Sequence, residues 1–294
     1  VPDEEMGSQW GMNWLCENRP DLVDVEFELS EGGAGASRFA GKQAKLFNVA
    51  TNEKLGAGLR LTAVGKPGHG SRPHEDNSAI HLMRALLKLH EWDRGITYTP
   101  DTLGYLQRLA EAGLMPPLDQ RDEVEAQIRR SPQMYAAFVN TLNVTVVNSG
   151  IKSNVIPAKS EAIIDCRILP GESREAWKQA VSDYVDDPRI TVEFARNVPV
   201  PPNVAAEWDT ELFRAINAVI HESMEDAVVV PGMTVGATDN RFLRARGIPA
   251  YGFIPCLLSP EESAGFHGNN EFLTVDNLNM GIELMYEIVR RMCT

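Results

Sequence analysis

The feature that most constrains the fold is a second α/β pattern, beginning near residue 58, inside a longer one. Within residues 58–198, alternating apolar and polar residues predict four strands, and stretches with helical spacing lie between them. Their order, βαββαβ, is that of a ferredoxin-like α/β sandwich. Residues 95–138 have a mostly helical composition and interrupt this order. The pattern therefore predicts one α/β domain inserted into another.

The elements of the inserted region follow from the spacing of apolar residues. Ile80, Met83 and Leu87 share one stripe of a helix, and Ser173 can cap a second helix that carries Trp177. The expected strands are 59–64, 142–146, 162–168 and 190–194, and the expected helices are 77–92 and the segment after Ser173.

Residues 1–57 and 199–294 are expected to form the outer α/β domain. The strand Leu22 to Leu29 would deliver Glu31 into a glycine-rich loop at its carboxyl end, where open α/β sheets place their ligands. Asn52, Glu53 and Lys54 are interpreted as a turn. The other expected strands are 45–49, 228–230 and 250–254. The expected helices are 210–224, a short one near Asp239, and a terminal helix with Leu278, Ile282, Met285 and Val289 inward.

Composition excludes several classes of function. The 294 residues are enough for two domains. A net charge of -13 argues against nucleic-acid binding, and no apolar run reaches the ~20 residues of a membrane span. The cysteines form no C-x-x-C pair, which favours a reducing compartment, so we expect a cytoplasmic protein.

Acidic side chains open the sequence. Of the adjacent carboxylates Glu4 and Glu5, one can hold a cation while its neighbour moves a proton. The alternative is a solvated turn, and for Glu31 a charged strand end. His267 lies in a loop beside Gly268, and neutral imidazole is the commonest protein ligand for zinc, although a loop histidine is more often a surface residue.

A second set of polar residues lies in the inserted region. His69 follows its first strand among small residues, so its imidazole is accessible, or is simply part of a turn. Asn154 and Arg167 lie on elements expected to neighbour it. An arginine fork suits a substrate carboxylate, and a solvated strand residue is the alternative.

Together these segments resemble one protein family along nearly the whole chain. The sequence is similar to the dinuclear-zinc peptidases and deacylases that include aminoacylase, carboxypeptidase G, carboxypeptidase S, acetylornithine deacetylase and succinyl-diaminopimelate desuccinylase. The segments that carry the resemblance are Pro2-Asp3-Glu4-Glu5, Ser30-Glu31-Gly32-Gly33, Gly68-His69-Gly70-Ser71, Ser153-Asn154-Val155-Ile156-Pro157, Asp165-Cys166-Arg167, Leu169-Pro170-Gly171, Gly236-Ala237-Thr238-Asp239 and His267-Gly268.

The resemblance implies a role for each of these residues. Glu4 would be the general base, Glu5 and His267 would bind one zinc, and Glu31 would bind the second. His69 would stabilise the oxyanion in the active site of the other subunit of a homodimer, formed through residues 58–198. The implied substrate-binding residues are Asn154, Arg167, Thr238, Asp239 and Arg241.

One part of the family pattern has no counterpart here. The family's His-x-Asp motif and metal-bridging Asp lie upstream of the acidic pair, and no histidine of this sequence precedes Glu4. We therefore expect an N-terminally truncated catalytic domain that lacks its first strands and holds zinc weakly, with cobalt or manganese as other possible metals. Two functions remain open: a zinc-dependent hydrolase of amide bonds in short peptides or N-acyl amino acids, and a catalytically silent fragment that only self-associates.

Overall fold

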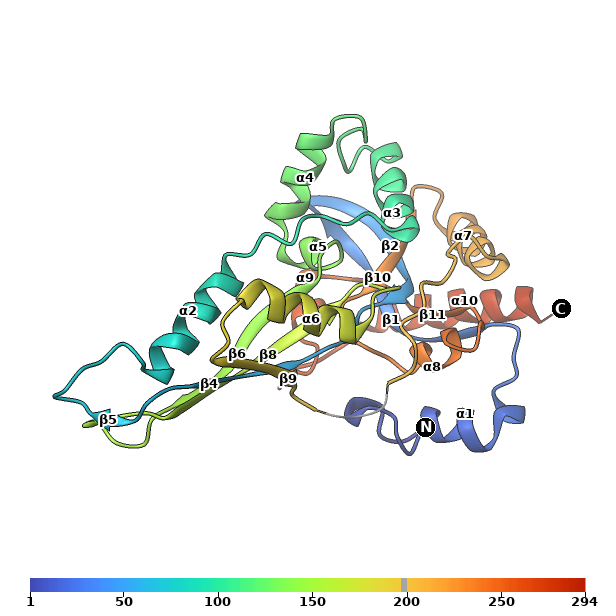
Figure 1. The fold of residues 1–294 in the computed structure, drawn as a ribbon. Helices are drawn as coiled ribbons and strands as arrows, with labels where there is room; N and C mark the ends of the chain where they lie inside the picture. The colour runs from blue at the N-terminus through green and yellow to red at the C-terminus, as the bar shows by residue number, and fades with distance from the viewer. Residues whose placement is uncertain (197–199, 294) are drawn as a thin grey trace. The chain divides into compact units, whose positions relative to one another are not determined.

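The computed structural model describes residues 1–196 and 200–293 and divides into two compact units (Figure 1). Unit 1 and unit 2 are each built from separate stretches of the chain. Unit 1 comprises Val1–Glu53, Thr97–Phe138 and Val204–Thr294, and unit 2 comprises Lys54–Ile96 and Val139–Asn203. The expected domain boundary at residues 198 and 199 falls outside the described residues.

Unit 2 has the predicted ferredoxin-like order. Its main strands pair in the order β9-β4-β8-β6, all antiparallel. A short strand β3 also pairs with β8, and the small β5–β7 pair is separate. The elements are β3 (Leu55–Gly56), β4 (Leu59–Val64), β5 (Gly68–His69), α2 (Ser78–His90), β6 (Thr141–Ser149), β7 (Val155–Ile156), β8 (Lys159–Ile168), α6 (Arg174–Val185) and β9 (Ile190–Phe194).

Strand β8 shows why the periodicity of unit 2 could be interpreted correctly. Ala162, Ile164 and Cys166 are buried in the core under α2 and α6, while Asp165 and Arg167 lie on the opposite face and pair with each other. A period of two is what a half-buried strand imposes. Helix α2 turns Met83 and Leu87 outward instead, because the side chains that face the core are Leu82, Ala85 and Leu89.

Unit 1 contains a mixed sheet whose described strands have the order β1-β11-β2-β10. Parallel pairs join β1 to β11 and β2 to β10, and an antiparallel hairpin joins β1 to β2. Phe47, Val49 and Phe253 from the sheet pack with Leu284 and Ile288 of the terminal helix. The elements are η1 (Glu4–Met6), α1 (Met12–Asn18), η2 (Pro20–Leu22), β1 (Glu28–Phe39), β2 (Lys42–Glu53), α7 (Glu211–Ser223), β10 (Val228–Thr234), α8 (Asn240–Arg244), β11 (Ala250–Leu258), α9 (Pro260–Ala264) and α10 (Val275–Met292).

Strand β1 corrects the expected strand at residues 22–29. Leu22 ends the 3-10 helix η2, which Pro20 begins, and the strand starts only at Glu28 and continues past Glu31. Gly32 and Gly33 have positive φ of 100° and 62°, and the pairing with β11 shifts register across them. Glycine tolerates this conformation, so Glu31 lies at a bulge within a strand and not in a loop after one.

The helical insertion belongs to unit 1, whereas it was expected within the inserted domain. It forms α3 (Pro100–Glu111), α4 (Arg121–Arg130) and α5 (Pro132–Ala136). Helix α3 packs on β10. Arg108 donates to the side-chain oxygen of Asn217 at 3.1 Å and to the carbonyl of Val229 at 3.2 Å. The contacts of α3 therefore place the segment in unit 1, a pairing that sequence order alone does not reveal.

The inward face predicted for the terminal helix is wrong. Leu278, Ile282 and Val289 are 49%, 59% and 50% exposed, and Met285 is only partly buried. The buried face is instead formed by Asn277, Gly281, Leu284 and Ile288. Helix α10 thus carries two apolar stripes, and the core selects the one in which Gly281 approaches Cys256 and Asn277 hydrogen-bonds the backbone of Leu257.

Two expectations from composition concern cysteines and membranes. All four cysteines are free in the described structure. Across residues 1–196 and 200–293, no helix is both long enough and apolar enough to cross a lipid bilayer.

Candidate active site

The acidic opening folds into a tight turn. Asp3, at φ 60°, precedes the 3-10 helix η1, and its carboxylate accepts a hydrogen bond from the backbone amide of Trp10 at 2.9 Å. The carbonyl of Asp3 accepts from the amides of Met6 and Ser8. These bonds within the turn fix the direction in which Glu4 and Glu5 leave the backbone.

Glu4 lies among other charged groups of unit 1. The pKa of its carboxyl is raised to about 7, first by burial and then by the negative charges of Glu31, Asp239 and Glu5, while the charge of Arg241 opposes them. Coulombic effects of this kind weaken with distance, so these groups lie around one place. A carboxyl with a pKa near 7 can both take up and release a proton at neutral pH.

The turn between β10 and α8 is fixed by two residues that the sequence analysis missed. The carboxylate oxygen Oε2 of Glu53 accepts from the hydroxyl of Thr238 at 2.5 Å and from its amide at 3.2 Å. Arg244 of α8 lies 2.6 Å from the same oxygen, and both members of this ion pair are buried. The sequence had suggested a turn at Asn52-Glu53-Lys54, but Glu53 ends a buried stretch of β2. A charged residue three positions after the apolar pair Val49-Ala50 was the only signal in the sequence.

A second carboxyl, the partly buried Glu28, adjoins this turn. The side-chain amide of Asn240, with its nitrogen toward β1, donates to Glu28 and to Ser30 Oγ at 3.2 Å. Burial raises the pKa of Glu28 to about 7; hydrogen bonding from Ser30 and the charge of Arg244 act in the opposite direction. Nothing in the spacing of residues 22–29 marked Glu28 as partly buried.

His267 follows α9 in a loop, at a left-handed φ of 58°. Glu262 holds this loop by accepting from the amides of Ser259 at 2.8 Å and Thr274 at 3.0 Å, and these bonds lower its pKa to about 2. In the described part of the chain, no three or more His, Cys, Asp or Glu side chains are grouped so as to bind a metal ion. The structure therefore does not group His267 with Glu5 and Glu31 as a ligand set.

His69 is exposed on the short strand β5 of unit 2. It pairs with Val155 of β7, and the amide of Gly70 donates to the carbonyl of Asn154 at 2.8 Å, so His69 and Asn154 are neighbours. The Nδ1 of His69 accepts from the amide of Ser71 at 3.2 Å. An imidazole that accepts at Nδ1 carries its proton on Nε2, which leaves an N–H donor available.

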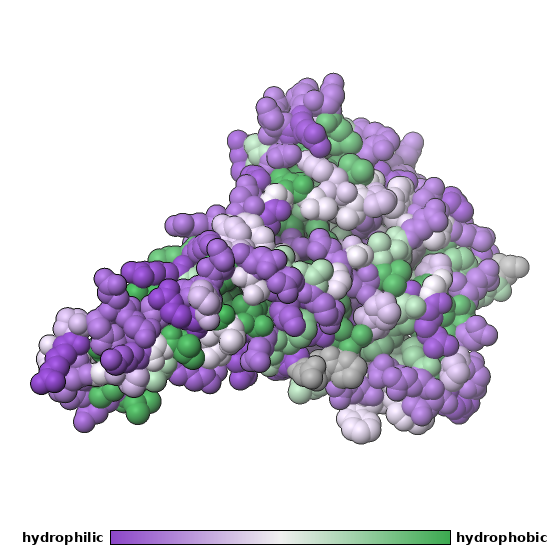
Figure 2. Space-filling view, in the orientation of Figure 1, coloured by the Kyte–Doolittle hydropathy of each residue, from purple (hydrophilic) through white to green (hydrophobic). Residues whose placement is uncertain are grey.

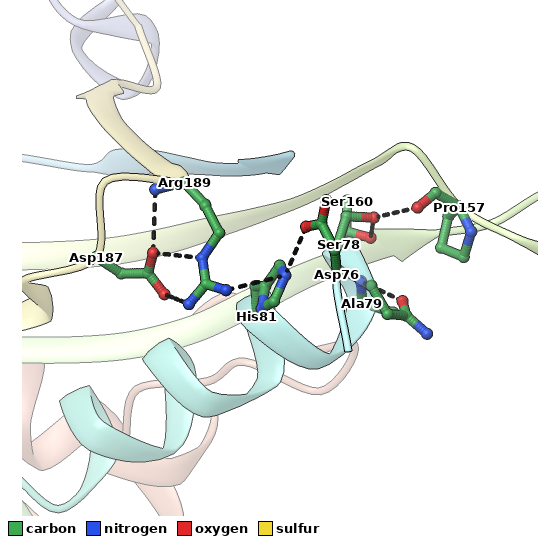
Figure 3. A network of polar contacts seen from close by, with 9 residues as sticks. Asp76, Ser78, Ala79, His81, Pro157, Ser160, Asp187 and Arg189 are labelled. Carbon is green, nitrogen blue, oxygen red and sulfur yellow. Dashed lines mark hydrogen bonds and ion pairs between the residues drawn. The ribbon is translucent and has the colours of Figure 1, made fainter. Parts of the chain in front are cut away.

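A polar network anchors the segment after β7 to helix α2 (Figure 3). The hydroxyl of Ser78 donates to the carbonyl of Pro157 at 2.8 Å and lies 2.9 Å from that of Ser160. The Nε2 atom of the buried His81 lies 3.1 Å from Oδ1 of Asp76 and 3.4 Å from Nη1 of Arg189. The bonds of Ser78 fix the segment that follows the loop carrying Asn154.

Arg167 occupies a different part of unit 2. It pairs with Gly56 near one end of β8 and makes a bidentate ion pair with Asp165 at 2.8 and 3.0 Å. The loop of Asn154 precedes the other end of β8, at Lys159. Within one chain, therefore, the structure brings His69 and Asn154 together but not Arg167.

Comparison with known proteins shows what this chain is similar to. Residues 51–191 match the model of the M20 peptidase dimerisation domain. The chain is related to the M20 peptidases. Aminoacylase-1A of Rattus norvegicus is 27% identical over 293 residues, and human aminoacylase-1 is 29% identical over 269 residues. These alignments cover 98% and 88% of this chain but 62% and 55% of the relatives, so the chain spans little more than half of their length.

Solved structures of M20 enzymes share the fold. The M20 metallo-carboxypeptidase Sso-CP2 of Sulfolobus solfataricus has a TM-score of 0.62 at 15% identity, with 98% of this chain and 68% of that chain covered. Human carnosine dipeptidase 1 has a TM-score of 0.61 at 12% identity, with 97% and 64% covered. These structures confirm the mixed α/β fold predicted from the sequence.

Proposed function

We propose that this chain provides the acidic part of an active site that hydrolyses amide bonds in short peptides or N-acyl amino acids. The observation that carries the proposal is the clustering of Glu4 with Glu5, Glu31 and Asp239, together with a Glu4 pKa of about 7. Such a carboxyl suits a general base that takes a proton from water and then returns it to the leaving amine.

The other residues of unit 1 would hold the substrate. Thr238 and Asp239 are buried, and the charges of Asp239 and Arg241 act on the carboxyl of Glu4, so this turn would line the pocket. Arg241 offers a planar fork that matches a substrate carboxylate, because two parallel N–H groups can bind both of its oxygens. Asp239 would face the reacting end of the substrate.

We propose that this chain supplies only some of the ligands of a metal centre. Glu5, Glu31 and His267 have the chemistry of zinc ligands, and cobalt or manganese accept the same donors. A zinc site normally takes at least three protein ligands, and the described residues bring no such set together. The residues present therefore do not fit a complete zinc centre, so we assign no step of the reaction to a metal.

Unit 2 would join two copies of the chain. The dimerisation-domain match supports self-association through residues 58–198. Figure 2 shows apolar residues, in green, among hydrophilic ones over the part of the surface that carries α2 and β6. Exposed apolar side chains there are Met83 and Leu87 on α2 and Val144, Val146 and Val147 on β6. Strand β6 also ends the order of main strands, and an edge strand offers backbone groups to a partner.

In such a homodimer, His69 would serve the active site of the partner subunit. Its exposed Nε2–H could donate to the oxyanion that forms when water attacks the amide carbonyl, since preorganised donors stabilise that charge. Asn154, beside it, and Arg167 would bind substrate. Because Arg167 lies elsewhere in unit 2, it would act from a different direction.

The alternative is a catalytically silent chain that only self-associates, which the incomplete ligand set favours. Gel filtration followed by metal analysis and an amidase assay distinguishes the two. A dimer with bound zinc and chelator-sensitive hydrolysis of N-acyl amino acids or dipeptides supports the hydrolase. A dimer without metal or turnover supports the silent chain.

A further inference from the structure

We propose that Glu53 is a positioning residue for the acidic site, and that Thr238 acts as the link between Glu53 and Asp239. The inference deepens the proposed function and rests on it for its catalytic consequence. In this account the Thr238 hydroxyl donates its hydrogen bond to Glu53 and does not bind the substrate. Asp239 is the residue of the turn that faces the substrate.

The geometry begins with a buried carboxylate at the end of β2. Glu53 is 6% exposed, and its Oε2 accepts from Thr238 Oγ1 at 2.5 Å and from Thr238 N at 3.2 Å. The same oxygen forms an ion pair with Arg244 Nη2 at 2.6 Å. Hydrogen bonds to an ionised acceptor are roughly twice as strong as neutral ones. One oxygen thus fixes both the backbone and the side chain of Thr238.

The hydroxyl of Thr238 has no proton left for a substrate. A threonine hydroxyl carries a single donor hydrogen, and here it points to Glu53. The same oxygen accepts from the backbone amide of Asn240 at 3.2 Å. Asp239, at the N-cap of α8, makes no capping bond with its side chain. Thr238 therefore satisfies an amide that the N-cap residue leaves unpaired.

The network continues to the strand that carries Glu31. The side chain of Asn240 bonds Ser30 and Glu28 on β1. Ser30 immediately precedes Glu31 in the sequence. Polar contacts therefore connect Glu53 to the turn of Asp239 and to the strand of Glu31.

Asp239 is the member of the turn whose position these bonds determine. It is 9% exposed, and its Oδ1 accepts no hydrogen bond from the described residues. Its backbone lies between Thr238, which Glu53 holds, and Asn240, which Thr238 holds. A side chain without a bond at that oxygen depends on its backbone for orientation, so a change at Glu53 should displace Asp239.

The first test measures amide hydrogen exchange by NMR in the whole protein. Thr238→Val removes the hydroxyl but keeps the Glu53–Arg244 pair, and Thr238→Ser keeps the hydroxyl. We expect exchange at Asn240 to accelerate about tenfold in T238V, the equivalent of one hydrogen bond, and to remain unchanged in T238S. Glu53→Gln should accelerate exchange at both Thr238 and Asn240. The amide of Val229 in β10 is the control for a retained fold. Unchanged exchange at Thr238 and Asn240 in E53Q would overturn the proposal.

The second test separates positioning from substrate binding through kinetics. With an N-acyl amino acid as substrate, E53Q and T238V should lower kcat by about 10–100-fold with KM nearly constant, and T238S should restore kcat. A raised KM in T238V with kcat unchanged would mean that the hydroxyl binds substrate, contrary to the proposal. If the unmodified protein shows no turnover, the proposed function fails, while hydrogen exchange still decides the role of Glu53.

Discussion

Glu53 and Lys54 are consecutive, and both are buried, yet each unit accommodates its charge differently. Glu53, in unit 1, retains an opposite charge, Arg244, at 2.6 Å. Lys54, in unit 2, donates to the carbonyl of Val139 at 2.8 Å and to Thr141 Oγ1 at 3.2 Å. Burial lowers the pKa of Lys54 to about 7, and the charges of Arg167 and Arg94 add to this effect. A partner of opposite charge favours the charged form of a buried group, whereas burial near groups of the same charge favours its neutral form.

The largest expected effect comes from breaking the ion pair of unit 1. Arg244→Met leaves the carboxylate of Glu53 buried without its partner, which should lower the free energy of unfolding by about 3–5 kcal/mol. Urea denaturation measures the loss, and E53Q/R244M should recover most of it. Lys45→Met, which breaks the exposed Lys45–Asp226 pair, is the control and should cost under about 1 kcal/mol. Equal losses in R244M and K45M would contradict the account.

Unit 2 should depend chiefly on its apolar core. Leu61 of β4 is fully buried, whereas Leu87 of α2 is 60% exposed. We expect Leu61→Ala to cost about 2–5 kcal/mol, because it removes buried methyl groups and leaves a cavity, and Leu87→Ala to cost under about 0.5 kcal/mol in the monomer. Thermal and urea unfolding at low protein concentration measure both changes. A loss of stability in L87A as large as that in L61A would contradict the expectation.

The pH dependence of unit 2 should reflect Lys54. The folded pKa of about 7 lies below the ordinary lysine value of about 10.4, so the unfolded chain binds the extra proton between these values. The free energy of unfolding should therefore rise by about 3–4 kcal/mol from pH 7 to pH 10. Urea titrations at both pH values, compared with Lys54→Met, isolate this contribution. A rise of the same size in K54M would assign it to other groups.

Unit 1 should show the opposite slope at lower pH because of Glu28. Its folded pKa of about 7 lies above the ordinary value of about 4.3, so the folded state binds the extra proton in this window. The free energy of unfolding should fall by about 2–3 kcal/mol as the pH rises from 4.5 to 7. Glu28→Gln should flatten this part of the curve, measured as the difference in Tm between the two pH values. If stability depends on pH as strongly in E28Q as in the unmodified protein, Glu28 is not the cause of this dependence.

The same contrast explains which features could be predicted from sequence. In unit 2, the alternation along β8 and the Ser173 cap of α6 are local signals, and the structure follows them. In unit 1, Glu31 lies at a bulge, and α10 has two apolar stripes between which only packing decides. A local sequence pattern does not show which distant residues will pack together.

The site itself was predictable only in part. Glu4, Glu5, Glu31 and Asp239 have a recognisable chemistry, and the charges of the last three raise the pKa of Glu4. The Glu53–Arg244 pair could not be predicted, because its members are 191 positions apart and each looks like an ordinary surface charge in its own segment.

The most direct test of the proposed function compares the unmodified protein with Glu4→Gln in the hydrolysis of an N-acyl amino acid with zinc supplied. If Glu4 is the general base, its loss should lower kcat by about 10²–10⁴-fold while the fold and any bound metal are retained. Equal turnover in E4Q, or no turnover in the unmodified protein, would contradict the assignment of this acidic cluster as a hydrolytic centre.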